Sequence, residues 1–227
     1  MAARAAAGRH HLDGNALRTE RTRSRVLAAS LALFNERGEA HVGTGAIAEA
    51  LGMSPGNLYY HFPNKDAIVE HLFRRFEERV DVAPAAPESP VAAVENLWLY
   101  LHLMLEAIWD YRFLYRNLDD LLERSPRLRS RFVRILDRKQ ETVVSLCDGL
   151  VRSGAMRARP DEIRALGHNV LVVSTYWLNF QSVRGLDAAS APAAMGQGAY
   201  HVMALVAPYL AGAARRHLDR LSRSYIE

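Results

Sequence analysis

The segment from residue 44 to residue 62 constrains the fold most, because two short helical patterns lie on either side of a glycine. Thr44 is a favourable N-cap for the first pattern. Its apolar residues recur at helical spacing and are Ile47, Ala48 and Leu51. Gly52 follows the last turn, where a glycine adopts the left-handed conformation at no steric cost. Ser54 and Pro55 then begin the second pattern, as N-cap and first helical residue.

The second helical pattern separates an apolar face from a polar one. Leu58 and Phe62 are four residues apart, so they would share the buried face of a helix. Pro63 ends the pattern, since it has no backbone N–H. The side chains expected to point outward are Asn57, Tyr59, Tyr60 and His61. Two helices joined by a short glycine-containing turn, with an exposed polar face on the second, are typical of the helix-turn-helix of DNA-binding proteins.

The residues of this segment resemble the tetracycline-repressor (TetR) family of bacterial transcription regulators. The resemblance extends over residues 18–80 and is one of layout beyond them. Its matching features are Thr44 before Ile47-Ala48, the string Gly52-Met53-Ser54-Pro55-Gly56-Asn57-Leu58-Tyr59-Tyr60-His61-Phe62, and Lys65. The sequence departs from common members at Gly43 and Gly45, where Thr or Ser and Arg are frequent, so DNA contacts from that segment are in doubt.

The resemblance also implies roles for individual residues. The helix that begins at Pro55 would enter the major groove, Asn57 and Tyr60 would contact bases, and Gly56 would let the backbone approach closely. Phosphate contacts would come from Thr44, Ser54, Tyr59, His61 and Lys65. Such phosphate contacts set the register and the affinity of a DNA complex but do not read its sequence.

The positive charge of the chain is concentrated at its N-terminus. The net charge of the 227 residues is +4. The first 25 residues contain six arginines and two acidic residues, a surplus equal to that net charge. We expect residues 1–17 to be a disordered basic arm, either an inert tail or an additional DNA contact. The first helix should run over residues 19–37. An arginine cluster lies near its start, where positive charges oppose the helix dipole. A neighbouring phosphate would offset that cost, and the alternative is a solvated basic face. These arginines are Arg21, Arg23 and Arg25.

The rest of the chain shows helical periodicity and no strand alternation. Residues 18–80 are predicted to form the helix-turn-helix domain, with a fourth helix at 64–80 that Asn64 caps. The segment 81–90 contains three prolines and marks the expected domain boundary. The helices expected beyond it are 91–109, 111–124, 125–152, 160–184 and 193–221, the last kinked at Pro208. The predicted fold class is therefore all-α, with an N-terminal three-helix helix-turn-helix domain, a C-terminal helical ligand-binding and dimerisation domain at 91–227, and about nine helices.

The last two long helices, about 161–184 and 193–221, predict a homodimer. Apolar residues cover so wide an arc of each helix that both sides need a partner. A symmetric homodimer is the commonest way to cover a second side. The family resemblance implies the same arrangement, and a two-fold protein reads two half-sites of a palindromic operator about one helical turn, ~34 Å, apart.

Aromatic residues in the second half of the chain suggest a pocket for a small apolar effector. Apolar walls carrying a few polar groups are typical of small-molecule sites. The candidate residues are Trp98, His102, Trp109, Asn117, Tyr176 and Trp177. The family resemblance implies such a pocket as a class, whereas the alternative for each single residue is an ordinary core or surface position.

The sequence contains no recognisable catalytic motif. It has no glycine-rich phosphate loop, no His-Glu-x-x-His and no Gly-x-Ser-x-Gly, so we expect neither an enzyme nor a cofactor. The histidines are scattered and no metal site is expected, although His168 and His201 could meet across two helices. Cys147 is the only cysteine, which excludes an intramolecular disulfide and favours a cytoplasmic protein with that thiol in its core. No apolar run reaches the length of a membrane span.

The sequence thus predicts a cytoplasmic, homodimeric transcription regulator that binds double-stranded DNA and is most simply a repressor released by a small apolar ligand. Within the same family, an activator or a regulator without a ligand remains open. The alternatives from other classes are a small helical enzyme or lipid carrier, and a non-specific architectural DNA-binding protein. The mild net charge argues against the last of these.

Overall fold

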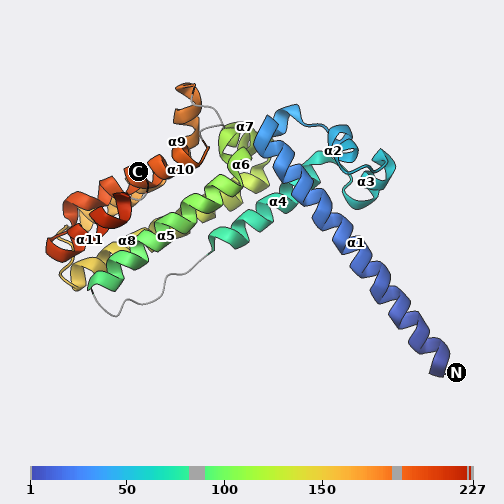
Figure 1. Cartoon of the computed structure of the whole chain (residues 1–227), viewed down its shortest axis with the longest axis horizontal. Coiled ribbons are helices and arrows are strands. Elements are labelled where there is room, and N and C mark those ends of the chain that lie inside the picture. The colour runs from blue at the N-terminus through green and yellow to red at the C-terminus, as the bar shows by residue number, and fades with distance from the viewer. Residues whose placement is uncertain (1, 82–89, 186–190, 224, 226–227) are drawn as a thin grey trace. The chain divides into compact units, whose positions relative to one another are not determined.

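The chain folds into two compact helical units. The structure is a computed structural model that describes residues 2–81, 90–185, 191–223 and 225. These residues form eleven α-helices and no strand, which confirms the predicted all-α class (Figure 1). The first unit comprises residues 1–75 and the second residues 76–227.

The first unit contains the helix-turn-helix segment. Its helices are α1 (Ala2–Arg37), α2 (Thr44–Ala50), α3 (Pro55–His61) and the greater part of α4 (Lys65–Val80), with a 3₁₀ turn at Glu39–His41. Helices α1, α2 and α3 pack against one another. Their shared core consists of the apolar residues at helical spacing, among them Val26, Leu27, Phe34, Ile47, Leu58, Phe62, Ile68 and Leu72.

Helix α1 begins much earlier than the sequence led us to expect. We expected a disordered arm over residues 1–17 and a helix from Thr19, but α1 begins at Ala2. The expectation relied on the lack of apolar residues in the arm. The arm is also rich in alanine, which has the highest helix propensity, and a helix that has begun extends readily through alanine.

The helix caps of the first unit agree with the sequence at two of three positions. The Ser54 hydroxyl accepts a hydrogen bond from the Asn57 N–H at 3.2 Å, and Asn64 Oδ1 accepts one from the Ala67 N–H at 2.8 Å. Thr44 was wrongly expected to be an N-cap, because it is the first helical residue of α2 and Gly43 takes the cap position.

The second unit is a bundle of long helices. Its elements are α5 (Pro90–Asp110), α6 (Arg112–Arg116), α7 (Leu118–Arg124), α8 (Pro126–Arg152), α9 (Pro160–Val183), α10 (Ala191–Val206), a 3₁₀ turn (Ala207–Tyr209) and α11 (Gly212–Arg223). Helix α5 packs against α8, α10 and α11, and α9 packs against α8 and α10.

Two helices that we expected to be continuous are broken. The helix expected at 111–124 is interrupted at Asn117, which separates α6 from α7. The helix expected at 193–221 was predicted to kink at Pro208, but it ends in the 3₁₀ turn and resumes at Gly212, whose φ is 52°. The break is stable because the backbone groups released there bond to a neighbouring segment: the Tyr209 carbonyl accepts from the Arg157 N–H at 2.8 Å.

The boundary between the units lies inside α4 and not in the proline-rich segment. Residues up to Arg75 belong to the first unit, and Phe76 begins the second. The ring of Phe76 lies 5.7 Å from that of Tyr111 and 5.8 Å from that of Tyr115. The last turn of α4 therefore has its own partners in the second unit, whereas most of the segment 81–90 lies outside the described residues.

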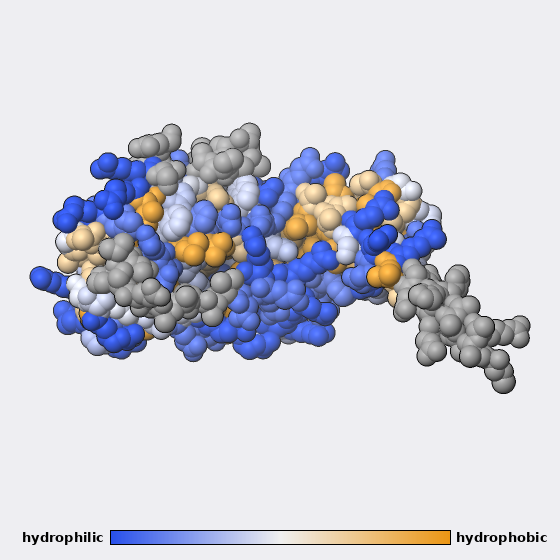
Figure 2. Space-filling model, turned by 60° about the horizontal axis from the view of Figure 1, so that its bottom comes forward, coloured by the Kyte–Doolittle hydropathy of each residue, from blue (hydrophilic) through white to orange (hydrophobic). Residues whose placement is uncertain are grey.

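Polar residues cover most of the face drawn in Figure 2, and apolar residues reach that surface only in separate patches. The most exposed large apolar or aromatic side chains among the described residues are Leu17, Tyr59, Tyr60, Leu99, Val133, Val172, Tyr176, Phe180, Val183 and Tyr200. In the described part of the chain, no helix combines the length and the apolar character needed to cross a bilayer.

Candidate nucleic-acid interface

Helix α3 has one buried face and one exposed face. Leu58 is fully buried and Phe62 is 1 % exposed, as their spacing predicted. On the outer face Tyr60 is 78 % exposed and Asn57 is exposed as well. A short helix held by its apolar face and its Ser54 cap thus presents an amide and a phenol to the outside.

The N-terminal residues of the predicted interface lie at the joint between α2 and α3. The Thr44 hydroxyl and the Tyr59 hydroxyl form a hydrogen bond of 3.0 Å, which links the start of α2 to α3. Pro55 and Gly56 are exposed in the first turn of α3. A Cβ added at Gly56 would meet no atom within 4 Å, so the protein itself does not require glycine there.

His61 is the predicted interface residue that the structure places differently. We expected its side chain to point outward, but it is only 8 % exposed. It follows Leu58 by three residues, so it shares the buried face of α3. Its backbone carbonyl also accepts a hydrogen bond of 2.7 Å from Arg23 Nη1 on α1.

Arg23 stabilises the first unit and does not belong to a free arginine cluster. Besides its bond to His61, its Nη2 lies 2.9 Å from His71 Nε2, and its guanidinium lies 4.5 Å from the centroid of the Phe62 ring. Burial and the nearby arginine charge lower the pKa of His71, which favours the neutral imidazole that accepts this bond. The sequence left either a phosphate neighbour or a solvated face open for the arginines at 21, 23 and 25, and Arg23 instead makes contacts within the first unit.

Lys65 binds a buried carboxylate. Its Nζ lies 2.9 Å from Glu39 Oε1 and donates a 3.0 Å hydrogen bond to the Glu39 carbonyl. The Glu39 side chain is fully buried and that of Lys65 is 24 % exposed. Removing the lysine would take a positive charge away from this buried carboxylate, which is costly. The predicted phosphate contact of Lys65 stays a prediction, and a structural role accounts for the residue as well.

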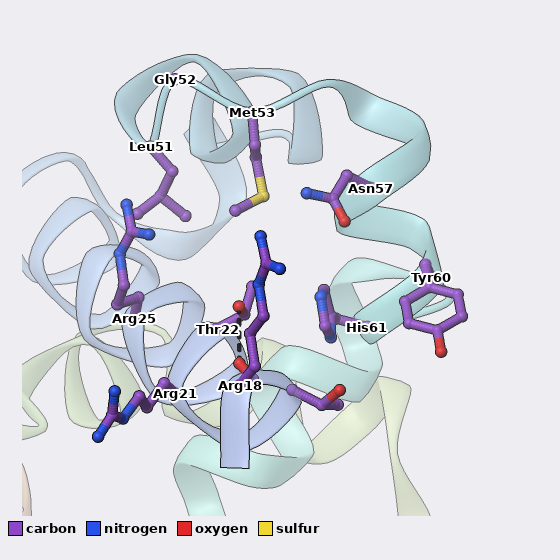
Figure 3. Close-up of a pocket in the computed structure, with 11 residues that line it drawn as sticks. Arg18, Arg21, Thr22, Arg25, Leu51, Gly52, Met53, Asn57, Tyr60 and His61 are labelled. Carbon is purple, nitrogen blue, oxygen red and sulfur yellow. Dashed lines mark hydrogen bonds between the residues drawn. The ribbon is translucent and has the colours of Figure 1, made fainter. Parts of the chain in front are cut away.

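A cleft of about 680 Å³ opens in the first unit between α1 and the α2–α3 segment (Figure 3). Its lining residues are Arg18, Thr19, Arg21, Thr22, Arg25, Leu51, Gly52, Met53, Asn57, Tyr60 and His61. Sequence reasoning gave no interface role to six of them, which are Arg18, Thr19, Thr22, Leu51, Gly52 and Met53. The spacing of Arg18 and Arg25, seven residues apart, was a usable signal, because such residues share one face of a helix.

The candidate effector residues fall into separate groups in the second unit. Trp109 and Trp177 line one small cavity of about 10 Å³, together with Leu105, Ile108, Ser174, Leu178 and Met195. Trp98 stacks on His102, with ring centroids 5.4 Å apart. Trp98 and Trp109 are eleven residues apart on α5, about 16 Å along the helix axis.

Two further candidates have other positions. Asn117 occupies the break between α6 and α7, and Tyr176 is 47 % exposed on α9. Among the described residues, Trp109 and Trp177 line one cavity together, and the other four candidates have the positions given above. Helical spacing placed aromatic residues on these helices, but it could not show which of them meet.

The groups with other possible chemistry have ordinary structural positions. Burial raises the pKa of the Cys147 thiol to about 12, so it is a core residue and not a reactive thiolate. His168 and His201 are both exposed, and the ring of His201 lies 4.9 Å from that of Trp177. Within the described ranges, no three histidine, cysteine or acidic side chains are grouped so that they could hold a metal ion.

Two short helices joined by a turn that contains Gly52, the second with an exposed polar face, have the arrangement of the helix-turn-helix class of DNA-binding proteins. Two family profiles match the chain. "Bacterial regulatory proteins, tetR family" covers residues 26–72, and "Bacterial transcriptional repressor" of the TetR type covers residues 75–218. The chain belongs to the TetR family of bacterial transcription regulators.

Individual relatives agree with this family. The chain is 33 % identical to a TetR-family transcriptional regulator from Marinobacter aquaeolei, whose crystal structure superposes with a TM-score of 0.78 over 90 % of this chain and 98 % of that one. It is 27 % identical to the regulator TtgR of Pseudomonas putida over 158 residues, 64 % of this chain and 73 % of TtgR.

Two other similarities are limited, one in the length that it covers and one in its identity. The alignment with the regulator UidR of Escherichia coli is 29 % identical over 97 residues, 43 % of this chain, and spans 46 % of UidR, about half of its length. A transcriptional regulator from Saccharomonospora viridis in complex with choline has a TM-score of 0.60 over 81 % of this chain and 94 % of that one, but at 21 % identity it shows the fold alone.

Proposed function

We propose that this regulator binds a palindromic operator in the cytoplasm as a homodimer, represses transcription there, and is released by a small apolar effector. The observation that carries the proposal is the exposed face of α3, where Asn57 and the 78 % exposed Tyr60 lie close together in the chain. An amide reads adenine in the major groove by a bidentate hydrogen bond, and a phenol offers both a donor and an apolar surface. We assign base contacts to these two residues.

The proposed phosphate contacts surround the base contacts. Ser54 is exposed at the N-cap of α3, and the Thr44 hydroxyl at the start of α2 is hydrogen-bonded to the Tyr59 hydroxyl on α3. These groups would fix the register of α3 in the groove. Gly56 would let the backbone approach DNA, since the space beside it is open.

A stripe of exposed apolar side chains on α9 supports the homodimer. Val172, Tyr176 and Phe180 follow one another at intervals of four residues and are 47 %, 47 % and 52 % exposed. Residues at this spacing share one face of a helix. Helix α10, which packs against α9, adds Tyr200, which is 36 % exposed. A second copy of the same two helices would cover this stripe.

The proposed effector site is the cavity beside Trp109 and Trp177. Its present volume of about 10 Å³ is far below the ~300–1,000 Å³ of small-molecule sites, so an effector would have to displace side chains. Such a ligand shifts the conformation only as far as it binds the two states differently. The apolar lining, with Ser174 as a polar group, favours an apolar effector.

Helix α4 is the proposed connection between effector and DNA. Its first turn is held in the first unit by the Lys65–Glu39 ion pair. Its last turns are held in the second unit, where Glu77 pairs with Arg131 and Arg79 lies 3.7 Å from Glu106. A continuous helix fastened at both ends would transmit a displacement from one unit to the other.

The test measures binding to the DNA upstream of the protein's own gene against a scrambled duplex, at two salt concentrations. We expect a dimer to bind the first duplex at least ~10³-fold more tightly. Equal and steeply salt-dependent binding to both duplexes would contradict a sequence-specific regulator. Binding to neither would call for a selection from random sequences, and failure there as well would refute the proposal.

The variant Tyr60→Ala refines this test. Loss of one base contact should relax discrimination at one or two base positions by ~1–3 kcal/mol. The variant Tyr60→Phe keeps the ring and removes the hydroxyl, so it distinguishes the contribution of a hydrogen bond from that of apolar contact. An unchanged sequence preference in Tyr60→Ala would show that α3 does not read bases through this residue.

A further inference from the structure

The cleft of the first unit has a cationic wall on α1. Arg18 and Arg25 are seven residues apart, with Thr22 between them, so all three share one face of the helix. In Figure 3, Arg18 extends toward Met53 and Asn57, and Arg25 extends toward Leu51. Arg21 points away from α3 in the same view.

The charges of Arg18 and Arg25 are not neutralised by the lining of the cleft. None of the described residues that line it is acidic, and both arginines are exposed. Arg23 behaves differently, since its guanidinium already bonds to His61 and His71. The helix therefore uses one arginine for folding and directs two others into a cleft that an anion could enter.

The opposite wall belongs to the proposed reading helix. Figure 3 shows the Asn57 amide directed into the cleft, which Tyr60 also lines. His61 lines the cleft and is 8 % exposed, and its Nδ1 has no hydrogen-bond partner in the described part of the chain. Neutral polar groups on this wall and guanidinium groups on the other suit a phosphate ester.

The dimensions favour a polymer over a single small anion. Arg18 and Arg25 are about 10 Å apart along the axis of α1. Phosphates of one DNA strand recur every ~3.4 Å along the duplex axis, so the two guanidinium groups would contact different phosphates. The cleft, of about 680 Å³, adjoins α3, and a strand bordering the groove that α3 enters would pass beside it.

We propose that this cleft binds the sugar–phosphate backbone of DNA, with Arg18 and Arg25 on different phosphates of the strand that borders the major groove. The inference rests on the proposed function, in which α3 reads that groove, and it adds α1 as a second wall of the interface. Contacts of this kind raise affinity and set register without reading sequence.

The double variant R18Q/R25Q tests the cleft. A duplex selected by the wild-type protein from random sequences and a scrambled duplex are titrated over a range of salt concentrations. Loss of two phosphate contacts per subunit should reduce the slope of log K against log salt by ~2 per subunit, or ~4 per dimer. Affinity for both duplexes should fall by a similar factor, on the order of 10²–10³ near physiological salt, and their ratio should stay the same.

The matched control is R134Q/R216Q, which removes two exposed arginines from the second unit and changes the net charge equally. Circular dichroism checks that every variant is folded. As a second measurement, single phosphates of the selected duplex are ethylated. At some positions that flank the groove, ethylation should weaken DNA binding by the wild type but leave DNA binding by R18Q/R25Q unchanged. The cleft assignment would be overturned if the salt slope of R18Q/R25Q were no smaller than that of R134Q/R216Q. It would also be overturned if R18Q/R25Q lost affinity for the selected duplex alone.

The outcomes also separate this inference from the proposed function. If the wild type prefers the selected duplex but R18Q/R25Q keeps the slope, the regulator stands and the cleft assignment fails. If the wild type binds both duplexes equally and the slope still falls in the variant, the cleft assignment stands and sequence-specific regulation fails. If the selection with the wild type yields no bound duplex and the scrambled duplex is not bound either, both are refuted.

Discussion

Lys139 on α8 is a single residue whose burial has a measurable consequence. Its side chain lies in the second unit, where the residue is 4 % exposed. Its Nζ lies 3.4 Å from the Tyr115 hydroxyl and 5.7 Å from the centroid of the Phe76 ring. Burial lowers the pKa of this lysine from its ordinary value to about 7. The folded protein therefore holds a proton at this site less tightly than the unfolded chain does.

We predict that Lys139→Met stabilises the protein, and more so at pH 6 than at pH 9. Between the two pKa values, about 7 folded and ~10.4 unfolded, the unfolded chain binds one proton more. The lysine's contribution to the free energy of unfolding therefore rises with pH, so its penalty is greatest at low pH. The gain from Lys139→Met should be larger at pH 6 by about 2 kcal/mol.

Urea unfolding at both pH values measures this effect. The control is Arg134→Met, because Arg134 is exposed on the same helix and should show no such dependence. The Tyr115 hydroxyl loses its lysine neighbour in the variant, but that cost does not change between pH 6 and pH 9. A gain that is equal at both pH values would show that Lys139 does not titrate in this range.

At the scale of the element, α3 combines a strong folding signal with a residue that folding does not need. Gly52 has a φ of 60°, so glycine is required there to end α2. Gly56 lies within α3, is exposed, and has open space where a Cβ would lie. In a helix interior, glycine is less stable than alanine. We infer that Gly56 serves the approach of DNA.

We predict that Gly56→Ala separates stability from DNA binding. The variant should gain ~0.5–1 kcal/mol in the free energy of unfolding, because alanine loses less conformational entropy. It should also bind the operator less tightly, since a methyl group would stand between α3 and the DNA. Gly149→Ala on α8 is the matched control and should keep full DNA affinity. Unreduced operator affinity in Gly56→Ala would remove Gly56 from the interface.

At the scale of the whole molecule, DNA recognition as proposed needs two copies of the chain. Phe180 is 52 % exposed in the single chain and belongs to the stripe with Val172 and Tyr176. Burial of such a stripe between two copies would provide the hydrophobic stabilisation of a dimer. It would also fix the distance between the two reading helices that a palindromic operator requires.

We predict that Phe180→Glu produces a folded monomer. The side chain is exposed, so the fold of one chain should tolerate a charge there, whereas two charges facing each other in a dry interface should prevent pairing. Because a monomer contacts only one half-site, its affinity for the operator should be at least ~10²-fold lower than that of the dimer. Light scattering measures the mass. The control Val133→Glu changes a similarly exposed apolar residue on α8 and should remain dimeric. A dimeric Phe180→Glu would place the interface elsewhere.

The sequence alone determined the helix-turn-helix and the all-helical class. The reason is that these follow from local rules: Ser54 accepts the expected cap hydrogen bond, Gly52 adopts the left-handed conformation, and the four-residue spacing of Leu58 and Phe62 sets the buried face of α3. Signals of this kind involve neighbours a few residues apart, and one sequence contains them completely.

Tertiary structure decided everything that depends on residues distant in sequence. The contacts of Arg23 with His61 and His71, and the ion pair of Lys65 with buried Glu39, join residues that are far apart in the sequence. The arginine-lined cleft exists only because α1 packs beside α3. Periodicity gives the face on which a side chain lies but not the partner that it meets, because that partner is fixed by the packing of the whole unit.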